Sequence, residues 1–166
     1  MTDVLVLFGS KSDIDSYKQI LKILDKEKVS YDFKIASAHK TPEDVDNILK
    51  QDYKVVISGA GLAAALPGVV AARTIRPIIG VPCQGSYQGL DALLSIAQMP
   101  PGIPVLSVGV EKADIAAHAA VKILKRPDKV VLVGDKNNKA YKKAEEILRD
   151  FGVNHSHSEQ IIDNAI

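Results

Sequence analysis

Short runs of apolar residues recur along the chain, and each is followed by a cluster of small or polar residues and then by a segment with helical periodicity. The runs cover residues 4–8, 31–36, 55–58, 77–81, 105–110 and 130–133. Nearly continuous apolar strands that alternate with helices are typical of a parallel sheet covered by helices on both faces. The pattern therefore predicts an α/β fold with three layers, helix, sheet and helix.

Polar residues indicate where the first helices begin. We expect Ser12 to cap the first helix and Thr41 to cap the second, because short hydroxyl side chains accept hydrogen bonds from free amides at a helix start. The segment at 59–66, GAGLAAAL, is expected to be a loop. A helix that began earlier would place Pro67 in its interior, so we expect Pro67 to begin the third helix.

Length and charge limit the classes of protein to consider. The 166 residues suit one compact domain, and the formal net charge is only +1, without a long block of either sign. This balance does not favour nucleic acid or an anionic membrane as a partner. The most apolar stretch, 59–72, contains glycine and proline and is shorter than the ~20 residues of a membrane helix. We expect a single domain over 1–166 whose partner is a small molecule.

The N-terminus and the cysteine content favour a cytoplasmic location. Asp3 stands where a secretory signal would carry positive charge, and the apolar run after it is short. Cys83 is the single cysteine of the sequence, which suits a reducing compartment. It has no base next to it in sequence, so it is a weak candidate for a nucleophile.

Three turns that follow predicted strands carry the candidate chemistry: GSKSD, SAHKTP and SGAGLAAALPG. In an open parallel sheet, ligands bind beyond the carboxyl ends of the strands, where such turns meet. Small residues and free amides at helix starts suit an anion such as phosphate. His39 in the second turn is a candidate acid–base group, although a histidine in a turn is more often structural.

Two other kinds of site are not favoured. GAGLAA nearly matches a dinucleotide fingerprint, but it follows the third strand, and the next strand ends without the acidic residue that would hold a ribose. We therefore expect no nicotinamide cofactor. His155 and His157 alternate as in a strand but lack cysteine or carboxylate ligands nearby, so we expect no metal site there.

Read together with QMPPGIPV at 98–105, the three turns resemble the motifs of the aminoimidazole ribonucleotide carboxylase/mutase family of purine biosynthesis. The motifs occur in the family's order and spacing, and the resemblance runs from Val4 to about Leu124. It implies a flavodoxin-like α/β/α sandwich, no cofactor, and a homo-octamer with sites at subunit junctions. It also implies an enzyme that forms 4-carboxy-5-aminoimidazole ribonucleotide, with CO2 as a bound intermediate or as a substrate.

The resemblance also implies roles for individual residues. His39 would shuttle the proton at the imidazole carbon that gains the carboxylate, a task that suits a side chain whose unperturbed pKa is ~6.5. Lys40 would meet the ribonucleotide phosphate, and Asp13 would accept hydrogen bonds from the ribose hydroxyls. The loop 58–66 would lie over the aminoimidazole and enclose the CO2. The other expected substrate-binding residues are Gly9, Ser10, Ser12, Ser37, Ala38, Ser58, Gly59, Ala60, Gly61 and Leu66.

The two branches of this family use different carboxyl donors, and the sequence has features of both. Mutases move a carboxylate from the exocyclic nitrogen to the ring carbon, and usually have arginine after the histidine and a second histidine in AAHLPG. Direct carboxylases take free CO2 and resemble this chain in Lys40 and Ala65. The chain nevertheless lacks their Arg-Ser-Asn, and its segment 88–105 is similar to the mutases. We expect a mutase, with direct carboxylation as the alternative.

Two more distant functions are also considered. A carboxylase of nicotinate dinucleotide in nickel-cofactor synthesis also has alanine before Leu-Pro, but SAHK and QMPPG argue against it. A phosphoacceptor signalling domain of the same topology would need an aspartate at the end of the third strand, and VVISGAG contains none.

Residues 126–166 extend beyond the expected family core of residues 1–125. They contain one more apolar strand and a helix that would place five apolar residues on one face. These residues are Ala140, Ala144, Ile147, Leu148 and Phe151. We expect the extension to add an edge strand to the sheet or to pack on the core or on a neighbouring subunit.

Overall fold

The computed structural model describes residues 2–125, 130–150 and 155–158. The chain forms two compact units, residues 1–125 and 126–166, and each is described here by itself. No helix among these described residues is both long enough and apolar enough to cross a membrane.

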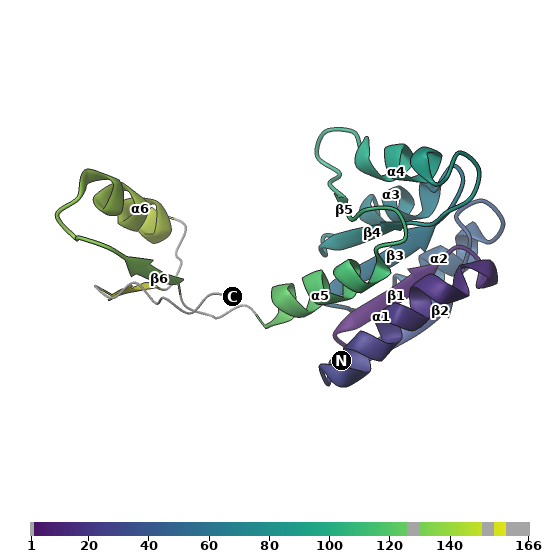
Figure 1. The fold of residues 1–166 in the computed structure, drawn as a ribbon, viewed down its shortest axis with the longest axis horizontal. Coiled ribbons are helices and arrows are strands. Elements are labelled where there is room, and N and C mark those ends of the chain that lie inside the picture. Colours follow the sequence, from purple (N-terminus) through teal and green to yellow (C-terminus); the bar gives the residue numbers. More distant parts are fainter. Residues whose placement is uncertain (1, 126–129, 151–154, 159–166) are drawn as a thin grey trace. The chain divides into compact units, whose positions relative to one another are not determined.

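The first unit is built on a five-stranded parallel sheet (Figure 1). Its strands are β1 (Val4–Phe8), β2 (Tyr31–Ile35), β3 (Val55–Ala60), β4 (Ile78–Pro82) and β5 (Leu106–Ser107). They lie in the order β2-β1-β3-β4-β5, so β3 is central and β1 pairs with both β2 and β3. This is the strand order of flavodoxin-like sheets, so the predicted fold class is confirmed.

Five helices cover the two faces of the sheet. They are α1 (Ile14–Lys26), α2 (Pro42–Ile48), α3 (Ala65–Ala71), α4 (Leu90–Ala97) and α5 (Ala113–Leu124). Helices α1 and α5 pack together on one face, over Val4, Val6 and Phe8, while α2, α3 and α4 cover Leu5 and Leu7 on the other (Figure 1). Alternate side chains of β1 thus enter two separate apolar layers, which is why the strand is apolar at every position.

The helix starts differ in detail from the predicted caps. Ser10, not Ser12, caps a short 3-10 helix, η1 (Lys11–Asp13), and its hydroxyl oxygen accepts from the Ser12 amide at 3.1 Å. Helix α1 then follows directly. Thr41 does precede α2, but its hydroxyl oxygen accepts a hydrogen bond from the Ser37 amide rather than capping the helix.

The bounds of three elements, β3, α3 and β5, differ from the predicted ones. Strand β3 runs on to Ala60 and α3 begins at Ala65, so Pro67 is the third residue of its helix rather than the first. Proline is tolerated there because amides of the first helical turn have no intrahelical partner. The fifth strand, predicted over 105–110, is only Leu106–Ser107, since the chain then turns towards α5.

The second unit is a β-α-β motif. Strand β6 (Val130–Val133) is followed by α6 (Lys139–Asp150) and β7 (His155–Ser158), and the two strands pair in parallel with Val130 opposite His155. The strand at 130–133 is present as predicted. Among the described residues, β6 and β7 form a two-stranded sheet.

The apolar face predicted for α6 is only partly correct. Ala144 and Leu148 are half-buried, but Ala140 and Ile147 are exposed. Tyr141, which the sequence analysis did not select, is the buried side chain. Phe151 lies outside the described residues. The buried face of α6 therefore includes the aromatic ring of Tyr141. The prediction missed this residue because the tyrosine was not counted among the apolar positions.

We expect truncation after Lys125 to lower the melting temperature or to change the oligomeric state. This follows from the sequence prediction that residues 126–166 pack on the core or on a neighbouring subunit, because each large apolar side chain removed from water contributes ~1.5–3 kcal/mol. Thermal unfolding and sedimentation of the truncated and full chains would measure both effects. A truncated protein that keeps its melting temperature and assembly but loses substrate binding would contradict a structural role for residues 126–166.

Candidate active site

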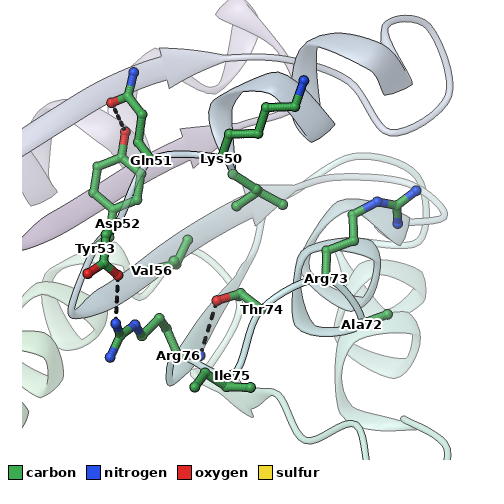
Figure 2. A pocket seen from close by; sticks show the side chains of 11 residues that line it. Lys50, Gln51, Asp52, Tyr53, Val56, Ala72, Arg73, Thr74, Ile75 and Arg76 are labelled. Carbon is green, nitrogen blue, oxygen red and sulfur yellow. Dashed lines mark hydrogen bonds and ion pairs between the residues drawn. The ribbon is translucent and has the colours of Figure 1, made fainter.

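Two of the cavities in the first unit lie at opposite ends of the strands. The larger, about 550 Å³, lies where β3 and β4 begin (Figure 2). Its arginines are already paired, Arg76 with Asp52 at 2.6 Å and Arg73 with Asp46 at 2.5 Å. The second, about 490 Å³, lies beyond the carboxyl ends of the strands, where parallel α/β sheets bind ligands. We take the second cavity as the candidate active site because of its position and because the exposed side chains of His39 and Lys40 line it.

The site cavity brings together the three turns that the sequence analysis selected. The expected residues that line it are Gly9, Ser10, Ser12, Asp13, Ser37, Ala38, His39, Lys40, Ala60, Gly61 and Leu66. The parallel pairing of β1 with β2 and β3 explains this, because the ends of neighbouring strands meet at one edge. Turns that lie far apart in the sequence therefore form one cavity.

The structure places Ser58 and Gly59 inside the sheet, not in the lining of the cavity. Both lie in β3 and are buried. A Cβ atom on Gly59 would lie 2.1 Å from Cε1 of Phe8, whose ring is completely buried. Gly59 thus lies where neighbouring strands pack too closely for a side chain, and its expected role in binding stays a prediction.

We expect Gly59→Ala to destabilise the fold by about 3 kcal/mol, at the upper end of the cost of overpacking a core. The Phe8 ring is completely buried in the core, so moving it away from the added methyl group would displace other core side chains. Gly9→Ala is the matched control, because its added Cβ would meet the nearest atom at 3.7 Å, an ordinary contact. Equal melting temperatures for the two variants would contradict this account of Gly59.

The sequence analysis missed Gln84 and Gly85, which follow β4 and line the cavity. They lie close to the loop after β3, since a Cβ on Gly85 would be 3.2 Å from Cδ2 of Leu62. A signal was present, because the fourth strand ends at the same edge of the sheet as the first three. The loop after β3 also contributes its residues 62–65 to the lining.

The turn that carries His39 is held by its own hydrogen bonds. The Ser37 hydroxyl oxygen accepts from the amides of His39 and Lys40, at 3.3 Å and 3.2 Å. The Thr41 hydroxyl oxygen accepts from the Ser37 amide at 3.0 Å. The side chains of His39 and Lys40 do not make these bonds and remain exposed, so both are available to a ligand.

Asp13 is the half-buried carboxyl group of the site. Burial raises the pKa of Asp13 above its ordinary value. The Ser12 hydroxyl, which donates a hydrogen bond to the carboxylate at 3.4 Å, lowers the pKa in part. The nearby Glu111 carboxylate raises it further. The hydroxyl oxygens of Ser10 and Ser12 are 2.7 Å apart. This turn therefore offers hydroxyl groups and one carboxylate to a polar ligand.

Strained backbone is concentrated around the cavity. Among the described residues, the non-glycine positions with positive φ are Lys28, Leu62, Ala64, Tyr87, Gln88 and Glu111. All except Lys28 lie in the loops that follow β3, β4 and β5. Left-handed conformations of such residues cost free energy and are held at functional sites by the surrounding structure. Their distribution supports the choice of this edge of the sheet.

The Cys83 side chain does not have the properties of a nucleophile. It is buried, and burial, with smaller contributions from Asp13 and Glu111, raises its thiol pKa to about 12. At neutral pH the thiol stays protonated, and the thiolate is the reactive form. Within the part of the chain that the structure describes, no three histidine, cysteine or acidic side chains lie close enough to hold a metal ion.

The fold is a flavodoxin-like parallel sheet with a cavity at the carboxyl ends of its strands, which is the place where α/β proteins of this class bind ligands. The family model described as AIR carboxylase matches residues 3–142. The chain belongs to the AIR carboxylase family, which is a family of enzymes. The match extends beyond Leu124, where the motif resemblance was expected to end, and into α6.

Relatives with known names agree with this family. N5-carboxyaminoimidazole ribonucleotide mutase of Methanocaldococcus jannaschii is 46% identical over 126 residues, which cover 75% of this chain and 80% of the relative. The mutase of Haemophilus influenzae is 44% identical, with 73% and 78% covered. Phosphoribosylaminoimidazole carboxylase of Schizosaccharomyces pombe is also 44% identical, but the match covers 72% of this chain and only 22% of that protein.

A solved structure gives the same result for the fold. The crystal structure of Treponema denticola PurE superposes with a TM-score of 0.62 at 26% identity, covering 92% of this chain and 98% of that one.

Proposed function

We propose that this enzyme forms 4-carboxy-5-aminoimidazole ribonucleotide by mutase conversion of N5-carboxyaminoimidazole ribonucleotide. The observation that carries the proposal is the joint lining of one cavity by the His39 turn and the Asp13 turn, which places an imidazole, an ammonium group and a carboxylate around one ligand site. Relatives at 44–46% identity are named as mutases, which supports the nitrogen-bound carboxylate, rather than free CO2, as the carboxyl donor.

In this proposal the two polar turns divide the ribonucleotide between them. Lys40, with the hydroxyl groups of Ser10, Ser12 and Ser37, binds the phosphate, because an ammonium group and hydroxyl donors suit an anion. Asp13 accepts hydrogen bonds from the ribose. The volume of about 490 Å³ is in the usual range for small-molecule sites.

The reacting end of the substrate lies between His39 and the loop after β3. The loop at 60–66 encloses the base and the CO2 that is released from the nitrogen and then captured by the ring carbon. His39 gives a proton to the nitrogen and takes one from the ring carbon as the carboxylate moves. No cofactor is needed for this transfer, because the imidazole alone exchanges protons near neutral pH.

Direct carboxylation of aminoimidazole ribonucleotide by CO2 is the second candidate. Two residues of the lining favour it: Lys40 follows the histidine, and Ala65 stands where mutases usually have a second histidine. Because Ala65 lines the cavity, a second imidazole is missing from this wall of the site. The same fold and the same His39 would serve both reactions.

An assay with the two carboxyl donors distinguishes these candidates. The purified enzyme is given N5-carboxyaminoimidazole ribonucleotide alone, or aminoimidazole ribonucleotide with bicarbonate, and formation of the carboxylated product is followed. We expect faster turnover of the nitrogen-carboxylated substrate. Turnover only with the second mixture would establish the direct carboxylase, and no turnover with either would overturn the proposed function.

We also propose that the enzyme works as a homo-octamer with its sites at subunit junctions. The apolar side chains of Leu90 and Leu94 on α4 are 54% and 47% exposed in the single chain, which suits a surface that another copy covers. Sedimentation of the full chain at several concentrations tests this. A stable monomer that turns over substrate would contradict it.

A further inference from the structure

Glu111 lies outside the lining of the site cavity, yet it connects three segments around it. It stands in the turn before α5, and its backbone amide donates to the Pro82 carbonyl at the end of β4, at 2.9 Å. One carboxylate oxygen accepts from the Gln84 amide at 2.5 Å, and the other accepts from the Ser16 hydroxyl at 3.2 Å. A single side chain thus joins the loop after β4 to the first turn of α1.

The Glu111 backbone is in a conformation that favours glycine. Its φ is 59°, in the left-handed region, where a side chain costs free energy. The two hydrogen bonds of the carboxylate compensate for this cost, and Ser16, which is buried, would lose the acceptor of its hydroxyl without them. Formation of the turn alone does not require a carboxylate at this position, so the Glu111 side chain has a role beyond the turn.

The segment that Glu111 holds is in contact with the loop proposed to cover the base. A Cβ on Gly61 would lie 3.4 Å from the Cys83 carbonyl oxygen, so the two segments touch along their backbones. Gly85 is equally close to Leu62. On the other side, Val110 packs against Gly89, where a Cβ would be only 2.5 Å from the valine side chain. Displacement of the loop after β4 would therefore displace the loop after β3.

We propose that Glu111 is a positioning residue of this enzyme, which holds Gln84 and Gly85 against the loop after β3 and thereby sets the wall of the cavity beside the reacting base. The inference rests on the proposed function for its catalytic consequence. Glu111 itself does not line the site cavity, and the hydrogen bond from the Gln84 amide to its carboxylate is the contact through which it holds the cavity wall.

Three variants of the full-length enzyme test the proposal, assayed with whichever substrate the wild type turns over. Glu111→Gly suits the left-handed backbone and should fold with little change in melting temperature, but kcat should fall by about tenfold because the wall is misplaced while the phosphate site is intact. KM should change less than kcat. Glu111→Gln keeps an acceptor for the Gln84 amide and a polar partner for Ser16, and should retain kcat within about threefold.

Lys28→Gly is the control, because it relieves a similar backbone strain, with φ of 56°, between α1 and β2. It should leave kcat unchanged. If Glu111→Gly keeps the wild-type kcat, or if Glu111→Gln loses as much activity as Glu111→Gly, the positioning role is wrong.

Hydrogen exchange separates a failure of this inference from a failure of the proposed function. In Glu111→Gly, amides at 84–89 and in the loop after β3 should exchange faster than in the wild type, whatever the reaction is. Unchanged exchange in both loops would overturn the inference even if the enzyme is active. An inactive wild type would instead overturn the proposed function, and the exchange result would still decide whether Glu111 holds the loops.

Discussion

Replacing His39 with asparagine is expected to lower kcat by about 10²- to 10⁴-fold, the usual contribution of general acid–base catalysis. An amide can form hydrogen bonds but cannot carry a proton at neutral pH. The fold and the turn should survive, because the bonds that hold the turn come from Ser37 and Thr41 and not from the imidazole. Steady-state kinetics, with substrate affinity from calorimetry, would separate lost turnover from lost binding.

A second histidine provides the matched control for this experiment. His118 lies on α5 and is exposed, so His118→Asn should keep full activity and the wild-type melting temperature. Activity of His39→Asn within tenfold of the wild type would show that the proton passes through another group. An equal loss in both histidine variants would indicate damage to the fold.

The second large effect is expected for Asp13→Asn, which should weaken catalysis and strengthen the fold. Hydrogen bonds to a charged acceptor contribute about 1.5–3 kcal/mol, so kcat/KM should fall by about tenfold or more if the ribose hydroxyls bind this carboxylate. The loss should appear in substrate affinity. Asp15→Asn, an exposed neighbour that does not line the site cavity, should bind substrate normally.

The gain in stability has a defined dependence on pH. The pKa of Asp13 is raised in the folded chain, chiefly by burial, so its protonated form favours folding and its ionised form disfavours it. The wild type should therefore lose this contribution as pH rises above the ordinary carboxyl value of 3.8. Asp13→Asn should melt higher than the wild type at pH 7, and the difference should shrink towards pH 3. A lower melting temperature at pH 7 would contradict the burial argument.

Segments whose pattern depends only on near neighbours were predicted well. The bounds of β1 and β6 agree with the apolar runs at 4–8 and 130–133, since both strands are apolar at every position and no polar residue blurs their ends. Helix caps were predicted less well. Whether Ser10 or Ser12 caps depends on how the chain leaves β1, and that path includes a 3-10 turn for which the sequence has no distinct signal.

The site residues also divide into those that the local sequence predicted and those that only the tertiary structure brought together. The turns at Asp13 and His39 could be selected from the sequence because each combines a strand end with polar side chains. Gln84 was missed although the fourth strand ends at the same edge, and Glu111 could not be found, because it lies 27 residues further along the chain. Its acceptor role exists only once β4 and the turn before α5 are next to each other.

By itself the sequence determined the parallel α/β class, the three loops that line the candidate site and the family, because apolar periodicity and short motifs are local properties of the chain. Only the tertiary structure decided that β6 pairs with β7, that Gly59 packs against Phe8 rather than lining the cavity, and that Glu111 holds the loop after β4. Each of these depends on contacts between distant segments. Such contacts arise from strand order and register, which hydrophobic pattern alone does not specify.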